Sequence, residues 1–248
     1  MTRPTDLSTR LLLVWILLGS SIFLPARNCN AQSQASTPPS QTHAQIEKVP
    51  NLYRIKQVLI SYHDCSCSCG CYQNEIDQVA GEAQSYLEER LAHTTQQAGK
   101  LAIVLDIDDT ALSDYDFLQS IDFGYRTDLF NAWVSQERGA PIAAVLRLFN
   151  FAVQNKVAVF FVTGRPESQR QATVDNLEKA GYHGWTDLFM KSDNFHPRRI
   201  SRFKSPVRHT IAAKGYTIVI NLGDQRSDLE GEGAELSLKL PNPFYYIR

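Results

Sequence analysis

The sequence predicts an α/β fold in which a central parallel sheet lies between two layers of helices, a three-layer sandwich. Three apolar runs at 101–105, 157–162 and 216–222 have the composition of strands that are covered on both faces. Amphipathic helical patterns separate these runs, and such alternation gives parallel strands joined by right-handed crossovers. The 248 residues suffice for one large domain or two small ones.

The expected elements follow in a regular order. A helix is predicted over 74–98, where apolar residues recur every three or four positions. After the first strand we expect a small helical insert at about 113–140. The later elements are helices over 141–154, 166–180 and 205–214, which alternate with the second and third long strands, and a weaker strand at 188–190. In such sheets ligands bind beyond the carboxyl ends of the strands, which is where a site is expected.

The N-terminus has the pattern of an export signal. Arg3 and Arg10 precede an apolar run at 11–26. This run is short for a membrane span, which needs about 20 residues. We expect residues 1–31 to be a cleaved signal peptide, with a retained anchor or lipid attachment at Cys29 as the less favoured alternatives. Residues 32–48, rich in Gln, Ser, Thr and Pro, are expected to be a flexible linker, and 49–248 the folded domain. The protein is thus expected to be periplasmic or secreted, without a stable membrane span after cleavage.

The overall charge is almost balanced. Lys and Arg total 25 against 26 Asp and Glu, a net charge of −1. This balance gives no support to a nucleic acid polymer as partner or to an acidic disordered tail.

Carboxylates are concentrated directly after the first predicted strand. Residues two apart on an extended segment point the same way, so Asp106 and Asp108 are expected to face one site and Asp109 to point elsewhere. Such acids repel one another without a cation, and Mg²⁺ takes oxygen ligands of this kind. Capping of the next helix is the alternative role for these residues.

The other two long strands also end in polar residues. Thr163 supplies a hydroxyl, and Gly164 lets the backbone approach a phosphate near the helix that Pro166 opens. Asp224, after Gly223, is placed to complete a metal site. A plain turn and a helix N-terminus are the respective alternatives. Because parallel strands end at one edge of a sheet, all these residues are expected to converge on one cleft.

Taken together, these segments resemble the four motifs of the haloacid dehalogenase (HAD) superfamily of phosphohydrolases. The motifs are Asp-x-Asp-x-Thr at 106–110, Thr-Gly-Arg at 163–165, Lys204, and Gly-Asp-x-x-x-Asp at 223–228. Together with Leu-Pro-Asn-Pro-Phe-Tyr-Tyr at 240–246, they are most similar to subfamily IIIB, the secreted acid phosphatases that include plant vegetative storage proteins. The resemblance covers about residues 50–248 and implies a HAD-like Rossmannoid fold.

The resemblance also implies roles for individual residues. Asp106 would be the nucleophile that forms an aspartyl-phosphate, and Asp108 the general acid and base. One Mg²⁺ per site would be held by Asp106, by the main-chain carbonyl of Asp108 and by Asp224. Thr163, Gly164 and Lys204 would bind the phosphate.

Four residues receive weaker assignments. Asp228 is expected to orient Lys204 or a metal-bound water. Lys204 is preferred over Lys191 and Lys214 because Lys-Ser-x-x-Arg matches the family motif. Arg165 and Arg208 lie near the cleft in sequence, and pairing with acids is at least as favoured as substrate binding for each.

The resulting hypothesis is a metal-dependent acid phosphatase that acts on small-molecule phosphate monoesters. A catalytically weak storage or metal-binding protein on the same fold and a phosphotransferase are the alternatives, and oligomerisation is left open. Some storage relatives lack the nucleophilic Asp, whereas this chain retains Asp106. Aromatic residues of the insert are expected to form its core rather than to stack on a leaving group: Tyr115, Phe117, Phe123, Tyr125, Phe130 and Trp133.

A cysteine cluster departs from the family pattern. Cys65, Cys67, Cys69 and Cys71 follow His63 within nine residues. Binding of a soft metal remains one alternative, and disulfides or free thiols remain the other. Bridges between cysteines two positions apart are geometrically strained.

Overall fold

The computed structural model describes residues 49–65, 71–93, 100–195 and 199–247. The expected signal peptide, the linker, Cys29, Cys67 and Cys69 lie outside these ranges. Within them, no helix combines the length and the apolar composition that crossing a membrane requires.

The centre of the domain is a five-stranded parallel sheet in the order β5-β4-β1-β6-β7. Leu105 pairs with Phe161 on one side and with Leu222 on the other, so the central strands end at one edge of the sheet. The strands are β1 (Lys100–Leu105), β4 (Ala158–Pro166), β5 (Asp187–Lys191), β6 (Tyr216–Gly223) and β7 (Leu236–Lys239). The predicted parallel sheet is confirmed.

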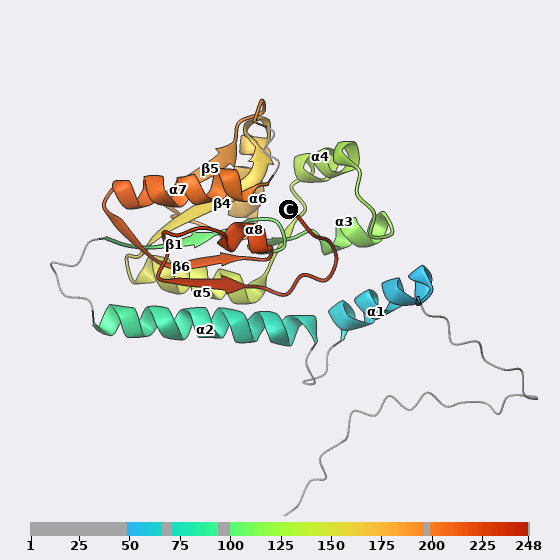
Figure 1. The fold of residues 1–248 in the computed structure, drawn as a ribbon, viewed down its shortest axis with the longest axis horizontal. Coiled ribbons are helices and arrows are strands. Elements are labelled where there is room, and N and C mark those ends of the chain that lie inside the picture. The colour runs from blue at the N-terminus through green and yellow to red at the C-terminus, as the bar shows by residue number, and fades with distance from the viewer. Residues whose placement is uncertain (1–48, 66–70, 94–99, 196–198, 248) are drawn as a thin grey trace, which may run out of the picture. The chain divides into compact units, whose positions relative to one another are not determined.

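Helices cover both faces of this sheet (Figure 1). The helix α7 (Ser201–Ala213) packs on β4 and β6 from one side, while α2 (Tyr72–Ala92) and α5 (Ala143–Gln154) pack on the other. Ile103 of β1 faces the larger core with α2 and α5, and its neighbour Val104 faces the core under α7. Both faces of the strand are therefore buried, which explains its uninterrupted apolar run and confirms the three-layer sandwich.

A small helical insert follows the first strand, as predicted. It contains α3 (Tyr115–Ser120) and α4 (Thr127–Ser135), and the short strands β2 (Leu112–Ser113) and β3 (Ala140–Pro141) pair antiparallel at its base. The aromatic residues Phe117 and Trp133 are buried and stack with ring centroids 6.0 Å apart. Tyr125, in contrast, is 68% exposed.

Several elements differ from the sequence prediction. The helix expected over 166–180 begins later, because Pro166 still belongs to β4 and a single 3₁₀ turn (Glu167–Gln169) precedes α6 (Arg170–Lys179). The elements that were not predicted include the helix α1 (Leu52–Asp64) and the edge strand β7. Neither has a strong burial pattern: α1 has no buried residue, and β7 only alternates between half-buried and exposed positions.

A disulfide joins the first two helices. Cys65, at the end of α1, is bonded to Cys71, just before α2, and their Cα atoms are 5.8 Å apart. The two cysteines are six positions apart, so the strained bridge between near neighbours is not used here. Their thiols are not available to a soft metal while the bridge is present.

The ring of His63 in α1 stacks on Tyr115 of the insert, with centroids 3.2 Å apart.

Candidate active site

Side chains from three strand ends and one helix meet at the carboxyl edge of the sheet. Asp106 follows β1, Thr163 lies near the end of β4, and Asp224 follows β6. Lys204 reaches the same place from the first turn of α7. All four side chains are buried. The structure therefore brings together residues that are up to 118 positions apart in the sequence.

Lys204 is held between two carboxylates. Its Nζ donates to Oδ1 of Asp106 and, at 2.7 Å, to Oδ1 of Asp228. Burial lowers the pKa of Lys204, but the two acids outweigh burial and raise the pKa above its usual range, so the side chain stays charged. Of the other lysines considered, Lys191 ends β5, and Lys214 lies 3.5 Å from Asp187 at the protein surface.

Asp228 is fixed by the turn that follows β6. Its Oδ2 accepts a hydrogen bond from the backbone N–H of Gln225 at 2.9 Å, as part of a capping box for the short helix α8 (Arg226–Leu229). Gly223 is needed here because a Cβ at this position would lie 2.5 Å from Oδ2 and Cβ of Asp228. Glycine thus lets the carboxylate pack against the end of the strand, where it reaches Lys204.

Asp108 lies beside Asp106 in the sequence and binds the last residues of β4. Arg165 donates from Nε to Oδ1 of Asp108 at 2.8 Å, and Thr163 Oγ1 donates to Oδ2 at 3.4 Å. Although burial raises the pKa of Asp108, the charge and hydrogen bonds of Arg165 outweigh it and lower the pKa. The Asp108 side chain is 19% exposed and that of Asp106 only 7%, so Asp108 is the more accessible of the two to solvent.

The neighbouring Asp109 makes a different contact. It has a left-handed backbone, with φ of 50°, in the turn after β1. Its Oδ1 accepts from the backbone N–H of Asp114 at 2.9 Å, which ties this turn to the insert. Burial and the charge of Asp224 raise the pKa of Asp109 to about 8.

The two arginines near the cleft both have protein partners. Arg165 forms the ion pair with Asp108 described above. Arg208 donates to main-chain carbonyls, at 2.8 Å to that of Asp228 and also to that of Glu230. Arg208 therefore supports the loop after α8 from beneath the site.

Asp224 has one bonded and one unbonded oxygen. Its Oδ2 accepts from Gln225 Nε2 at 2.6 Å and from Asn242 Nδ2 at 2.5 Å, while the buried Oδ1 has no hydrogen-bond partner among the described residues. Burial and the neighbouring Asp228 raise the pKa of Asp224 to about 6. Such a buried, electron-rich oxygen is the type of donor that Mg²⁺ takes.

The surrounding acids also fit a divalent cation. Carboxylate oxygens of Asp106, Asp224 and Asp228 lie within 4.8 Å of one another. Both oxygens of Asp228 already accept hydrogen bonds, which leaves Asp106 and Asp224 as the better carboxylate ligands of the three. The residues present therefore fit a bound Mg²⁺.

Two contacts to Asp224 were missed by reasoning from the sequence. The segment 240–246 matched the family pattern, but no role was assigned to Asn242, which lies 18 positions after Asp224. Gln225 is an unspecified position of the motif Gly-Asp-x-x-x-Asp, which assigns it no role. An amide next to a metal-ligating carboxylate leaves no pattern in sequence, so only the spatial contact identifies it.

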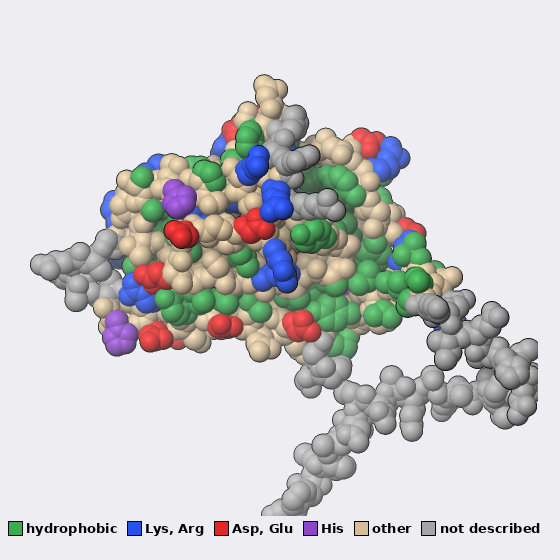
Figure 2. Space-filling model, viewed as in Figure 1, with side chains coloured by type: hydrophobic (Ala, Val, Ile, Leu, Met, Phe, Trp, Pro, Cys, Tyr) green, Lys and Arg blue, Asp and Glu red, His purple; other side chains and the backbone are tan. Residues whose placement is uncertain are grey.

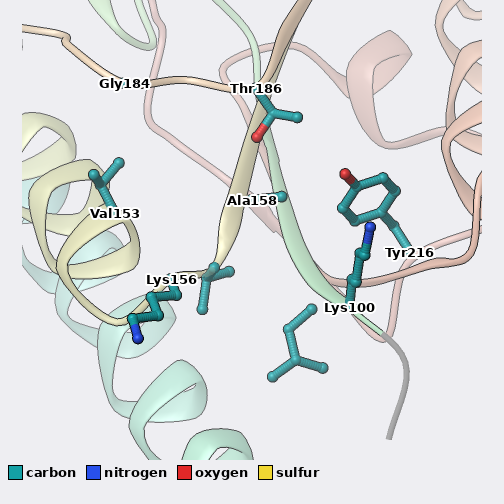
Figure 3. Close-up of a pocket in the computed structure, with 9 residues that line it drawn as sticks. Lys100, Val153, Lys156, Ala158, Gly184, Thr186 and Tyr216 are labelled. Atoms are coloured by element: carbon teal, nitrogen blue, oxygen red, sulfur yellow. The ribbon is translucent and has the colours of Figure 1, made fainter.

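One cavity of the described structure lies away from this site. It has a volume of about 280 Å³ and lies at the amino ends of the strands, where it is lined by Lys100, Ala158 and Tyr216 among others (Figure 3).

On the face of the molecule shown in Figure 2, Lys and Arg side chains lie among Asp and Glu side chains, in keeping with the balanced charge.

Comparison with known proteins agrees with this geometry. The model of the HAD superfamily, subfamily IIIB (acid phosphatase), matches residues 26–248. The chain is 34% identical over 180 residues to acid phosphatase 1 of Solanum lycopersicum, which covers 71% of this chain and 69% of that protein. It is 32% identical over 184 residues to the stem 28 kDa glycoprotein of Glycine max, over 71% and 70% of the two chains.

Other similarities extend over less of the chain or concern the fold alone. Vegetative storage protein 2 of Arabidopsis thaliana is 32% identical over 148 residues, 58% of this chain and 56% of that protein. The class C acid phosphatase from Bacillus anthracis superposes with a TM-score of 0.62 at 21% identity, over 77% of this chain and 86% of that chain, and shares the fold. The family match, the relatives and the arrangement of the strand-end residues agree with one another. The chain belongs to subfamily IIIB of the HAD superfamily, the acid phosphatases, and these enzymes are phosphomonoesterases.

Proposed function

We propose that this acid phosphatase is metal-dependent and hydrolyses small-molecule phosphate monoesters through an aspartyl-phosphate on Asp106. The observation that carries the proposal is the buried Lys204, which binds Asp106 and Asp228 at once beside the unbonded oxygen of Asp224. The Lys204 ammonium group orients the Asp106 carboxylate at the strand end. The same group can donate a hydrogen bond to an incoming phosphate.

In the first step, a carboxylate oxygen of Asp106 attacks phosphorus. The bond from phosphorus to the ester oxygen breaks, and its electron pair stays on that oxygen, which takes a proton from Asp108. Arg165 pairs with Asp108 in this structure, so it has to release that carboxyl as the anionic phosphate arrives. Thr163, the backbone at Gly164, and Lys204 hold the phosphate oxygens during the transfer.

In the second step, water attacks the phosphorus of the aspartyl-phosphate. Asp108, now ionised, takes a proton from this water, and the bond from phosphorus to Asp106 breaks. Inorganic phosphate leaves, and the Asp106 carboxylate is restored. Arg165, which pairs with Asp108 at 2.7 Å in this structure, favours the ionised form of Asp108 once it returns to that carboxylate.

The residues that would hold Mg²⁺ are Asp106, the main-chain carbonyl of Asp108, and Asp224. When bound, the ion offsets the negative charge of the acids and of the phosphate oxygens. Asp228 supports the site by holding Lys204 rather than by direct ligation, because its two oxygens already accept hydrogen bonds.

Hydrolysis of p-nitrophenyl phosphate by the purified protein tests this proposal. We expect turnover with Mg²⁺ between acid and neutral pH, loss of turnover in chelator and recovery when Mg²⁺ is restored. Asp106→Asn should lower kcat at least about 10³-fold, as the loss of a nucleophile does, while Asp116→Asn, at an exposed acid of the insert, should leave kcat unchanged. Full activity in chelator contradicts metal dependence, and full activity of Asp106→Asn contradicts the covalent mechanism.

The same assay separates the two alternative functions. No turnover under any condition would favour a storage protein, the description given to a relative that matches 58% of this chain. A phosphotransferase would produce a new phosphate ester when an acceptor alcohol is added. The retained Asp106 and its contact with Lys204 favour catalysis over storage.

We also propose that the protein is exported, with residues 1–31 as signal peptide, 32–48 as linker and 49–248 as the phosphatase domain. The disulfide between Cys65 and Cys71 supports this, because such bonds persist mainly outside reducing compartments. A relative named a stem glycoprotein is consistent with a secretory route. Sequencing the N-terminus of protein recovered outside the cytoplasm tests the boundary, and an intact Met1 on that material would contradict cleavage.

A further inference from the structure

Two side-chain amides converge on one oxygen of Asp224. Gln225 Nε2 and Asn242 Nδ2 both donate to Oδ2, at 2.6 and 2.5 Å. The other oxygen, Oδ1, is buried and has no hydrogen-bond partner in the described part of the chain. A carboxylate whose one oxygen accepts from two fixed donors cannot rotate freely, so its remaining oxygen points in a single direction.

Both amides are themselves held by the C-terminal segment. Asn242 Oδ1 accepts from the backbone N–H of Phe244 at 2.9 Å, and Gln225 Oε1 accepts from the backbone N–H of Ile247 at 3.0 Å. Phe244 is buried and packs on Tyr72 of α2, with ring centroids 5.4 Å apart. The segment that ends the chain is thereby anchored in the core and reaches directly to the candidate metal ligand.

We propose that Asn242, assisted by Gln225, is a positioning residue that aims Oδ1 of Asp224 at the divalent cation. The inference rests on the proposed metal-dependent function and adds a residue that ligand chemistry alone does not identify. Hydrogen bonds to a ligating carboxylate fix its orientation, and their loss generally weakens metal binding about 10- to 100-fold. In this role Asn242 acts through its hydrogen bond to Asp224.

The competing role for Asn242 is purely structural, because its side-chain oxygen also shapes the turn to Phe244. The variant Asn242→Ser separates these roles. A serine hydroxyl supports the same kind of turn, but its side chain is too short to donate to Asp224. Asn242→Ala removes both the turn acceptor and the donor.

Calorimetric titration of metal-free, full-length protein with Mg²⁺ measures the effect. For Asn242→Ser we expect the Kd for Mg²⁺ to rise about 10- to 100-fold, with kcat recovering at saturating Mg²⁺. The matched control is Asn155→Ser, an exposed position where the amide donates to the carbonyl of Phe151 at the end of α5 and to no other group among the described residues. In chelator, the Tm of Asn242→Ser should equal that of this control, while Asn242→Ala should unfold at a lower temperature.

The outcomes distinguish this inference from the function on which it rests. If the wild type binds Mg²⁺ and Asn242→Ser binds it equally well, the positioning role is overturned and the metal-dependent function stands. If the Tm of Asn242→Ser in chelator falls as far as the Tm of Asn242→Ala, and the folded variant keeps its Mg²⁺ affinity, the role of Asn242 is structural only. A wild type that is fully active in chelator and binds no Mg²⁺ overturns both proposals.

Discussion

The two edges of the central sheet are formed by the same strands and yet differ in almost every property. At the carboxyl edge, Asp106, Asp224 and Lys204 are buried and paired in hydrogen-bond networks. At the amino edge, Lys100 and Lys156 are exposed beside a cavity of about 280 Å³ (Figure 3). The difference follows from strand direction. The carboxyl end of each parallel strand leads toward the N-terminus of the next helix, where free backbone N–H groups favour anions. The chemistry therefore gathers at one edge, and the other edge is solvated.

This contrast has an energetic side. Charges at the carboxyl edge are mutually dependent, so the removal of one leaves another buried without a partner. Lys100 at the amino edge lies over the ring of Tyr216, 5.6 Å from its centroid, and water solvates it in any case. Substitutions at the two edges should thus differ widely in cost.

The largest difference is expected between two lysines. Lys204→Met should lower the free energy of unfolding by about 3–5 kcal/mol, because Asp106 and Asp228 lose their buried cation. Lys100→Met should change it by no more than about 0.5 kcal/mol. Urea denaturation of both variants in chelator measures the difference, and equal losses would remove the basis of the comparison.

Two glycines sharpen the same contrast. Gly223→Ala at the carboxyl edge should cost about 1–3 kcal/mol, because its Cβ would overlap Asp228 at 2.5 Å. Gly215→Ala, before β6 at the amino edge, meets no atom within 4 Å and should cost about 1 kcal/mol, from its φ of 88° alone. Only the first variant should also lose phosphatase activity in a p-nitrophenyl phosphate assay. If Gly215→Ala lost as much activity, the sheet edges would not be functionally distinct.

A gain in stability is expected at the amino edge. Lys156 follows α5 with a φ of 60°, and the backbone N–H of Val157 closes this helix end on the carbonyl of Ala152. Glycine is the residue best suited to this position, so Lys156→Gly should raise the free energy of unfolding by about 0.5–1 kcal/mol. Thermal unfolding of this variant and of Lys179→Gly should shift in opposite directions, because Lys179 is the last residue of α6 and pairs with Glu137.

The smallest effect is a pH dependence. Glu235, just before β7, pairs with Arg90 of α2 at 2.6 Å, and this hydrogen bond lowers the pKa of Glu235. The pair therefore stabilises the fold above the ordinary pKa of Glu, and the contribution is lost as pH falls through the lowered value. Because both side chains are partly exposed, Glu235→Gln should cost only about 0.5 kcal/mol at pH 7. Urea denaturation at pH 7 and pH 3 should show the difference at pH 7 alone, and a constant difference would exclude ionisation as its cause.

Much of the fold was predictable because burial on both faces of β1, β4 and β6 leaves a continuous apolar run. The elements that escaped prediction bury little: α1 has no buried residue, and β7 is a four-residue edge strand. The cysteine pairing was equally undetermined, since Cys65 and Cys71 are joined by the approach of α1 to α2 rather than by their spacing alone. The local pattern of apolar residues reflects burial, so it gives no signal for elements that bury few residues.

The sequence by itself determined the parallel sheet and which residues stand at its carboxyl edge, because both follow from strand direction and chain order. Only the tertiary structure decided which of these groups touch. It brought Lys204 to Asp106 and Asp228, paired Arg165 with Asp108, and carried Asn242 back to Asp224. Such contacts depend on how helices and the C-terminal segment pack against the sheet, and packing joins residues whose separation along the chain carries no periodic signal.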